Sequence, residues 1–182
     1  ELIGYAVEGV DVYAENKDVC ETVLTYLDAI NTVLEGTPFK LGYRAANEAL
    51  IYLQASQEFG QTDRIAALDN FTLMKILSRI EGDETKLKIT NSEADKKRIA
   101  NAGVNVDEAK QYGDLNILTA LRNIIAKQLG ESGHTDVTEE TTTELGEEKT
   151  SEEQSKKELL SVKKIDSMLS QLKRDHFVSF WN

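Results

Sequence analysis

Apolar residues recur at steps of three and four positions along most of this 182-residue chain, which contains one proline, Pro38. Because an α-helix has about 3.6 residues per turn, this spacing gathers the apolar side chains on one helix face. The scarcity of proline also favours long helices joined by Gly and Asn. The expected fold class is therefore mostly α, a helical bundle. The predicted helices cover residues 18–35, 43–59, 62–81, 93–102, 115–129 and 159–172.

Capping residues predict where several of these helices begin and end. Ser92 followed by Asp95 resembles a capping box, and Asp114 is the predicted N-cap of the fifth helix. Gly82 is expected to end the third helix and Gly130 the fifth, because glycine commonly follows the last turn of a helix.

The distribution of charge divides the chain. Residues 131–158 hold ten acidic and three basic residues and almost no large apolar side chain, so they carry −7 of the net charge of −11. Such a segment buries too little area to offset the entropy of ordering it. It is predicted to be an acidic flexible linker between a helical domain, 18–130, and a C-terminal helix with an aromatic tail, 159–182. Short β-favouring runs around Glu8-Gly9 predict a small β-hairpin and connector over 1–17.

The aromatic tail is expected to dock on the helical domain of its own chain. Phe177, Phe180 and Trp181 follow the apolar stripe of the last helix. Leaving three rings in water would forfeit a large hydrophobic area.

Several classes of protein and site are excluded. Cys20 is the one cysteine and His134 and His176 are the two histidines, so the chain has no internal disulfide and no Cys/His zinc site, and no metal site is predicted. Both histidines are interpreted as structural or solvated. No apolar run approaches the roughly 20 residues that cross a bilayer, so a cytoplasmic protein without a membrane partner is expected. The start at Glu1 within an extended run suggests a fragment of a longer protein or a processed product.

The chain has no phosphate-binding loop. No Gly-x-x-x-x-Gly-Lys-Ser/Thr segment occurs, and no apolar strand ends in Asp-Glu. No set of acid, base and nucleophile converges in the sequence either. The chain is therefore not a self-sufficient NTPase, and a free-standing enzyme is the least favoured interpretation.

Arg44 occupies an unusual position for a cation. It lies in the first turn of the second predicted helix, directly after Gly42-Tyr43, where a positive charge opposes the helix dipole. Its planar fork of donors matches phosphate oxygens, so contact with a phosphoryl group is one explanation. The alternative is a surface ion pair with Glu48, one turn later.

Three segments carry a family resemblance. They are residues 41–48 (Leu-Gly-Tyr-Arg-Ala-Ala-Asn-Glu), residues 73–87 (beginning Leu-Met-Lys-Ile-Leu-Ser-Arg-Ile-Glu-Gly-Asp), and residues 164–169 with 177–181 (Lys-Ile-Asp-Ser-Met-Leu and Phe-Val-Ser-Phe-Trp). In this order they resemble the C-terminal part of the AAA+ motor subunits of McrBC-type restriction systems. The resemblance spans most of the chain from about residue 20, with the acidic segment as an insertion.

The resemblance implies a helical lid of the AAA+ C-terminal type. Arg44 would be its sensor-type arginine, with Gly42 and Tyr43 as positioning neighbours in the nucleotide site. Arg79 is a second candidate, although Ser78 stands where a proline is common and residues 81–83 read Glu-Gly-Asp where other branches have His-Gly-Ser. The alternative for Arg79 is a solvated helix face or an ion pair with Glu81 or Asp83.

The resemblance also implies partners and a cofactor. The partners are a P-loop core of the same protein, a homo-oligomeric ring and a nuclease subunit, with DNA contacted mainly through other regions. GTP or ATP with Mg²⁺ would be bound by the full-length protein and not by this fragment alone. The main alternative is a helical interaction or scaffolding module. An exposed Arg44 that no local carboxylate engages would favour the lid, and an Arg44 buried against Glu48 or Asp28 would favour the module.

Overall fold

The computed structural model describes residues 17–61, 63–90, 92–132 and 159–182. The predicted β-hairpin and nearly all of the predicted acidic linker lie outside the described residues. In the described part, long helices dominate and one small antiparallel sheet accompanies them, so the expectation of a mostly α fold is confirmed. The long helices are α2 (Lys17–Val33), α3 (Tyr43–Glu58), α4 (Arg64–Phe71), α6 (Glu93–Asn101), α8 (Ile117–Ser132) and α9 (Leu160–Asp175).

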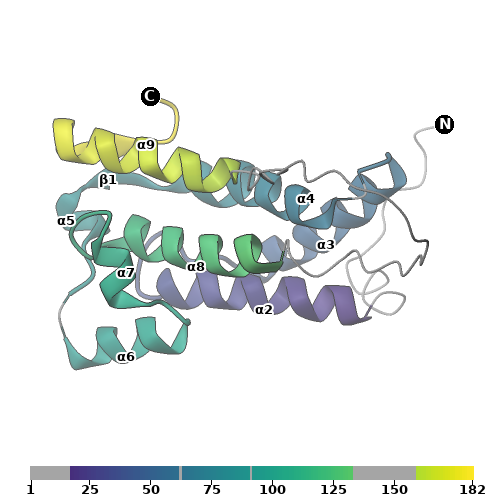
Figure 1. Cartoon of the computed structure of the whole chain (residues 1–182), viewed down its shortest axis with the longest axis horizontal. Helices are drawn as coiled ribbons and strands as arrows, with labels where there is room; N and C mark the ends of the chain where they lie inside the picture. The colour runs from purple at the N-terminus through teal and green to yellow at the C-terminus, as the bar shows by residue number, and fades with distance from the viewer. Residues whose placement is uncertain (1–16, 62, 91, 133–158) are drawn as a thin grey trace, which may run out of the picture.

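Helix α8 forms the centre of the bundle. It packs between α9 on one side and α2 on the other, while α4 contacts α9 and α3 contacts α4 (Figure 1). Leu118, Leu121 and Ile125 of α8 are fully buried, as their spacing predicts. Helix α6 lies at the outer side of α2, and the short helix α7 (Val106–Lys110) packs on α8.

The third predicted helix is interrupted. After α4 the backbone widens into a π-helix, η1 (Thr72–Ile76), tightens into a 3₁₀ turn, η2 (Leu77–Arg79), and then extends as strand β1 (Glu81–Asp83). Gly82 was expected to terminate a helix but is the middle residue of β1. Its φ of +148° favours glycine, and a Cβ at this position would also displace the Lys86 side chain, because it would lie 2.6 Å from Cδ of Lys86.

Strand β1 pairs with a segment almost a hundred residues away. Its partner is β2 (Phe177–Ser179), antiparallel, with Gly82 opposite the fully buried Val178. Local periodicity cannot reveal such a pairing, because neither three-residue strand has a repeat long enough to read. The short helix α5 (Glu84–Leu87) follows β1, capped by the Asp83 carboxylate.

The ends of α8 differ from the prediction. Its N-cap is Asn116, not Asp114: the Asn116 side chain accepts from the Thr119 amide at 3.0 Å, and the Thr119 hydroxyl accepts from the Asn116 amide at 2.9 Å. This reciprocal pair leaves Asp114 to contribute its backbone carbonyl, which accepts from the Thr119 hydroxyl. At the other end the helix continues past Gly130 to Ser132. The cap of α6 is as predicted, with the Ser92 hydroxyl accepting from the Asp95 amide.

The N-terminus of α9 is capped by a carboxylate from another helix. Asp69 of α4 is 3% exposed and accepts hydrogen bonds from the backbone amides of Leu160 at 2.7 Å and Ser161 at 3.1 Å. The Ser161 hydroxyl also donates to it. A negative charge at a helix N-terminus is favoured by the helix dipole and by the unpaired amides there. Asp69 therefore fixes where α9 docks.

A second buried polar contact lies three residues after Asp69, at Thr72, the first residue of η1. The Tyr26 hydroxyl lies 2.8 Å from the Thr72 hydroxyl, which donates to the Leu68 carbonyl. Burial raises the pKa of Tyr26 well above its usual range, so its phenol stays protonated. This contact joins α2 to the start of η1.

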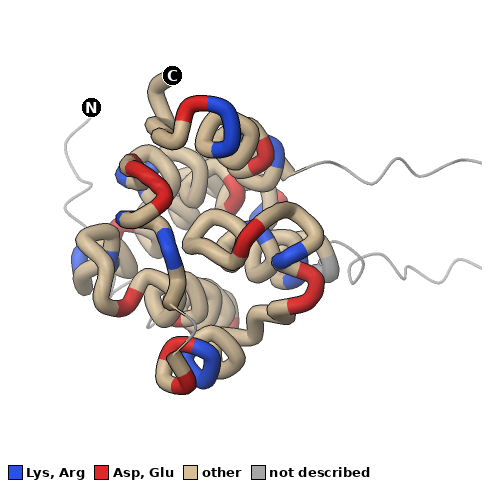
Figure 2. Tube along the Cα trace, turned by 90° about the vertical axis from the view of Figure 1, so that its left-hand side faces the viewer, with Lys and Arg blue, Asp and Glu red and all other residues tan. Residues whose placement is uncertain are grey.

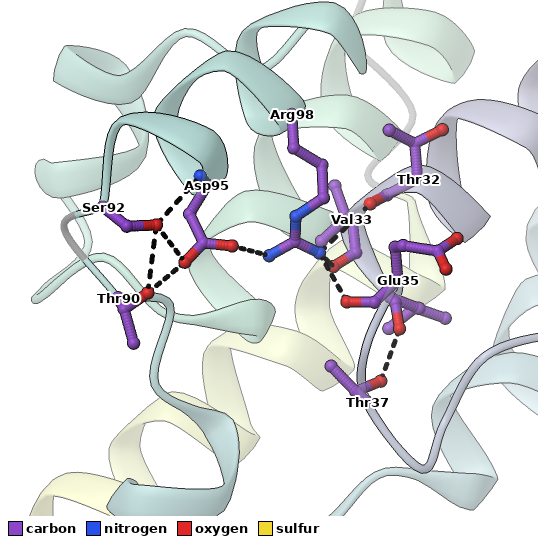
Figure 3. Close-up of polar contacts among 9 residues, drawn as sticks. Thr32, Val33, Glu35, Thr37, Thr90, Ser92, Asp95 and Arg98 are labelled. Atoms are coloured by element: carbon purple, nitrogen blue, oxygen red, sulfur yellow. Dashed lines mark hydrogen bonds and ion pairs between the residues drawn. The ribbon is translucent and has the colours of Figure 1, made fainter.

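Arg98 joins α6 to α2 (Figure 3). Its Nη1 donates to the carbonyls of Val33 at 2.9 Å and Glu35 at 2.7 Å, with a longer contact of 3.3 Å to the Thr32 carbonyl. Its Nη2 donates to Asp95 at 2.8 Å. The Thr32 and Val33 carbonyls lie in the last turn of α2, which has no basic residue of its own, and Glu35 lies in the turn that follows. Arg98 thus supplies a C-terminal cap from a distant part of the chain.

The C-terminal tail docks through its aliphatic residue more than through its rings. Val178 is fully buried and Phe180 is half-buried under the Lys164 ammonium, 4.6 Å from the ring centroid. Phe177 is half-exposed and Trp181 is 77% exposed, so the expected packing of all three rings on the core is wrong for these two. Pairing of β2 with β1 aligns the backbone but turns Phe177 outward, because successive side chains of a strand face opposite sides.

Replacement of Asp69 by Ala is expected to lower the free energy of unfolding by about 2–3 kcal/mol, the cost of a lost cap plus buried donors left without an acceptor. Urea denaturation measures the change. Ser92→Ala, which removes an exposed N-cap on α6, is the matched control and should cost about 1 kcal/mol. Equal losses for the two variants would contradict the assigned role of Asp69.

Replacement of Arg98 by Ala should cost about 2 kcal/mol, because several charge-assisted hydrogen bonds are lost and carbonyls at the end of α2 lose their donor. Lys at this position should restore only part of the loss, since one ammonium cannot reproduce the fork that serves the carbonyls and Asp95 together. Arg174→Ala removes an exposed arginine paired with its neighbour Asp175 and should change the unfolding free energy by less than about 0.5 kcal/mol. Full rescue by Lys would show that charge alone matters at Arg98.

Candidate functional site

The candidate site is the N-terminal turn of α3 and the face of η1 beside it. The chain is fixed to α2 immediately before α3 begins. The Asn31 side chain accepts from the Leu41 amide at 2.7 Å and donates to the Leu41 carbonyl at 3.2 Å. Leu41 itself is buried. Both backbone groups of Leu41 are thereby held, so the residues that follow start from a defined position.

Gly42 is the N-cap of α3 and leaves that end of the helix without a side-chain cap. A Cβ at Gly42 would meet no atom within 4 Å, and its φ of −90° suits any residue, so neither space nor conformation requires glycine here. No acidic residue lies in the first turn of α3. This end of the helix therefore retains the positive partial charge of its amides.

Tyr43 and Arg44 project from this turn into solvent. Tyr43 is 98% exposed and is the most exposed large apolar residue in the described part of the chain. The Arg44 side chain is 87% exposed. Arg44 is thus presented on the surface of the molecule by the first turn of α3.

Arg44 nevertheless has a partner in the structure. Its Nε donates to Oε1 of Glu48 at 2.8 Å, and the other carboxylate oxygen of Glu48 lies 3.4 Å from Nζ of Lys75 on η1. The hydrogen bond from Arg44, opposed by partial burial and reinforced by Lys75, lowers the pKa of Glu48. One carboxylate therefore bridges two cations from different elements.

The structure does not bring Arg79 into this group. Arg79 is exposed on η2 and, within the described residues, forms no ion pair with Glu48, Glu81 or Asp83. In a regular α-helix Lys75 and Arg79 would share one face, but η1 has wider turns, which changes the phase of the residues that follow. Sequence reasoning selected Arg79 and missed Lys75, because the phase change depends on a π-helix that the local pattern does not signal.

Arg44 meets parts of both conditions that separate a lid from an interaction module. It is exposed, as a lid arginine would be, and it is engaged by Glu48, as the alternative requires.

Arg98 and Arg122 have structural roles and differ from Arg44 in exposure. The guanidinium of Arg122 forms a two-point pair with Asp166, at 2.5 and 3.0 Å, and packs 3.4 Å from the Tyr112 ring centroid. Those two side chains are 20% and 14% exposed, so only Arg44 of the three offers its fork to an outside ligand.

The described part of the chain carries charges of both signs. Lys and Arg are interleaved with Asp and Glu along the described chain (Figure 2). Across residues 17–132 and 159–182, apart from positions 62 and 91, no group of three or more His, Cys, Asp or Glu side chains could hold a metal ion. Among the helices in the same ranges, none combines the length and apolarity needed to cross a membrane.

Comparison with known proteins identifies the family. A family model described as "Domain of unknown function (DUF8727)" matches residues 6–177, which is most of the chain. The chain belongs to this family. The DUF8727 chain matches no curated protein and no solved structure.

The pKa of Glu48 in the DUF8727 chain tests the geometry at α3. Because that pKa is lowered in the folded state, the Arg44–Glu48 pair contributes stability above the pKa of an unfolded glutamate, about 4.3, and loses it as the pH falls through the folded value. Carboxyl-carbon NMR should show Glu48 titrating below an ordinary glutamate, and Arg44→Ala should raise its pKa. Glu93, whose pKa is lowered by Lys96, is the internal control and should not respond. A Glu48 titration unchanged by Arg44→Ala would refute the pair.

Proposed function

We propose that this chain is the helical lid of a P-loop AAA+ NTPase motor, and that Arg44 is its sensor-type arginine. The observation that carries the proposal is the exposed Arg44 on a helix N-terminus that Asn31 holds in place. A permanently charged fork on a helix whose preceding residue is fixed by two hydrogen bonds suits recognition of phosphate oxygens. Exposure makes the fork accessible to a nucleotide bound by another domain.

The spatial arrangement of the three resembling segments supports the proposal. Residues 41–48 open α3, residues 73–87 run from η1 to α5, and the last segment occupies α9 and β2. The Glu48–Lys75 ion pair joins the first segment to the second, and the β1–β2 pairing joins the second to the third. Segments that are far apart in sequence thus form one connected part of the fold.

The chemistry follows from where charge builds during phosphoryl transfer. A guanidinium placed against the phosphate oxygens stabilises negative charge in the transition state. Loss of that contact after hydrolysis would release α3 and let the lid move relative to its core. In this proposal the P-loop core of the same protein holds GTP or ATP with Mg²⁺, and this chain contributes Arg44.

The remaining assignments belong to the same proposal. The motor would form a homo-oligomeric ring in the cytoplasm, act with a nuclease subunit in DNA restriction and contact DNA mainly through other regions. The interleaving of acidic and basic residues along the described chain fits a lid that does not itself track a nucleic-acid backbone.

A helical interaction module is the second candidate. The 2.8 Å contact between Arg44 and Glu48 favours it, because such i,i+4 pairs are common on exposed helices without any ligand. In that case the exposed Tyr43 ring would be part of a protein contact.

The test is triphosphate hydrolysis by the protein that joins this chain to its P-loop core. Arg44→Ala should lower turnover of GTP or ATP by about a hundredfold or more, the scale of removing one preorganised charge stabiliser. Arg174→Ala, also an exposed and ion-paired arginine, is the matched control and should leave turnover unchanged. Assembly is checked by light scattering. Unaltered turnover in a correctly assembled Arg44→Ala protein would leave the interaction module as the better description.

A further inference from the structure

Glu48 differs from the other carboxylates in its ion pairs. Among pairs formed between described residues, each of the others joins one acid to one base, whereas Glu48 binds Arg44 through one oxygen and Lys75 through the other. Its two partners come from α3 and η1, so the fold, not a single helix, brings the cations together. A carboxylate that bridges two cations occupies the position that a phosphate group would take.

The group is open enough for exchange. The exposed fractions of the Arg44, Lys75 and Glu48 side chains are 87%, 55% and 33%. Ion pairs this accessible contribute little to stability, so an incoming anion loses little by breaking them. Glu48 would return to water when displaced, which avoids leaving a buried charge without a partner.

The surroundings of the two cations favour an anion as well. The first turn of α3 has no acidic residue and no side-chain cap at Gly42, so its amides add positive potential beside Arg44. The amides at the start of α3 would not by themselves make an anion-binding site. The site is defined by the two cations and by the carboxylate that bridges them.

We propose that Arg44 and Lys75 form a two-cation seat for the phosphate oxygens of a polyphosphate, and that Glu48 occupies this seat until the ligand displaces it. Lys75, rather than Arg79, is the second cation. Glu48 is then a built-in competitor: it holds Arg44 in place in the empty state and sets how readily the seat is filled. The inference rests on the proposed function, because it assigns the same Arg44 to a nucleotide phosphate.

The experiment is calorimetric titration of the full chain with inorganic tripolyphosphate at low ionic strength, where screening is weak. Arg44→Ala and Lys75→Ala should each weaken binding by about fivefold, the scale of one exposed charge contact. Glu48→Gln should strengthen binding by about threefold, because the competitor loses its charge while its size is kept. A gain of affinity cannot come from misfolding, so this variant keeps the test decisive.

Matched controls come from the Glu93–Lys96 pair on α6, which is also exposed and joins oxygen to nitrogen at 2.9 Å. Lys96→Ala and Glu93→Gln should leave the affinity within about twofold of the unaltered chain. Absence of saturable binding, equal losses for Lys75→Ala and Lys96→Ala, or no gain with Glu48→Gln would each overturn the two-cation seat.

The two proposals fail in different ways. Tripolyphosphate binding that depends on Arg44 and Lys75, together with unaltered hydrolysis in Arg44→Ala, would remove the motor function and keep the seat. The opposite outcome would keep the motor function and remove the seat. In that outcome Arg44→Ala lowers hydrolysis, whereas Lys75→Ala and Glu48→Gln change neither hydrolysis nor the affinity for tripolyphosphate.

Discussion

The Asp69 carboxylate at the N-terminus of α9 is the contact on which the arrangement of the other elements depends. It lies in the core and accepts from two amides and a hydroxyl of the segment 159–161. Through it α9 is placed against α4, and α9 in turn positions β2 beside β1. A buried carboxylate is costly unless donors surround it, so the structure keeps this charge only where a helix end meets it. The position of residues 159–182, which form α9, β2 and the tail, follows from that requirement.

The need of a charged group for fixed partners when it is buried also distinguishes three arginines of this protein, Arg98, Arg122 and Arg44. The side chains of Arg98 and Arg122 are mostly buried. Arg98 donates to backbone carbonyls and Arg122 to Asp166, and these hydrogen bonds join helices to one another. Arg44 is outside, and its partner Glu48 is accessible and shared with Lys75. An arginine that stabilises the fold has its fork saturated by fixed acceptors, and an arginine suited to a ligand has an acceptor that can leave. This difference, together with Lys75 as a second cation on the same carboxylate, is the reason for assigning the candidate site to α3.

Much of the fold could be predicted from the sequence because its helices carry long apolar repeats and local caps. The spacing of Val23, Leu27 and Ile30 reports a buried face directly, and the Ser92 cap is read from four consecutive residues. Asp114 was predicted as the N-cap of α8 because aspartate is a common N-cap residue. Asn116 serves equally well, and only the reciprocal bond with Thr119 shows that Asn116 is the cap. The β1–β2 pairing and the π-helix η1 depend on contacts with distant residues, so no local pattern contains them. For the site, Arg44 stood out as a cation at an unfavourable helix end, whereas Lys75 became visible only when folding placed it beside Glu48.

The most direct test of the central claim is the position of the Arg44 guanidinium in a structure of the proposed motor protein, this chain with its proposed P-loop core, in complex with a non-hydrolysable triphosphate. Arg44 should have left Glu48 and should lie about 2.7–2.9 Å from a phosphate oxygen, the distance of a charge-assisted hydrogen bond. An Arg44 that remains on Glu48, with the nucleotide bound and no phosphate oxygen within reach, would contradict a role for this chain as the sensing lid of a nucleotide motor.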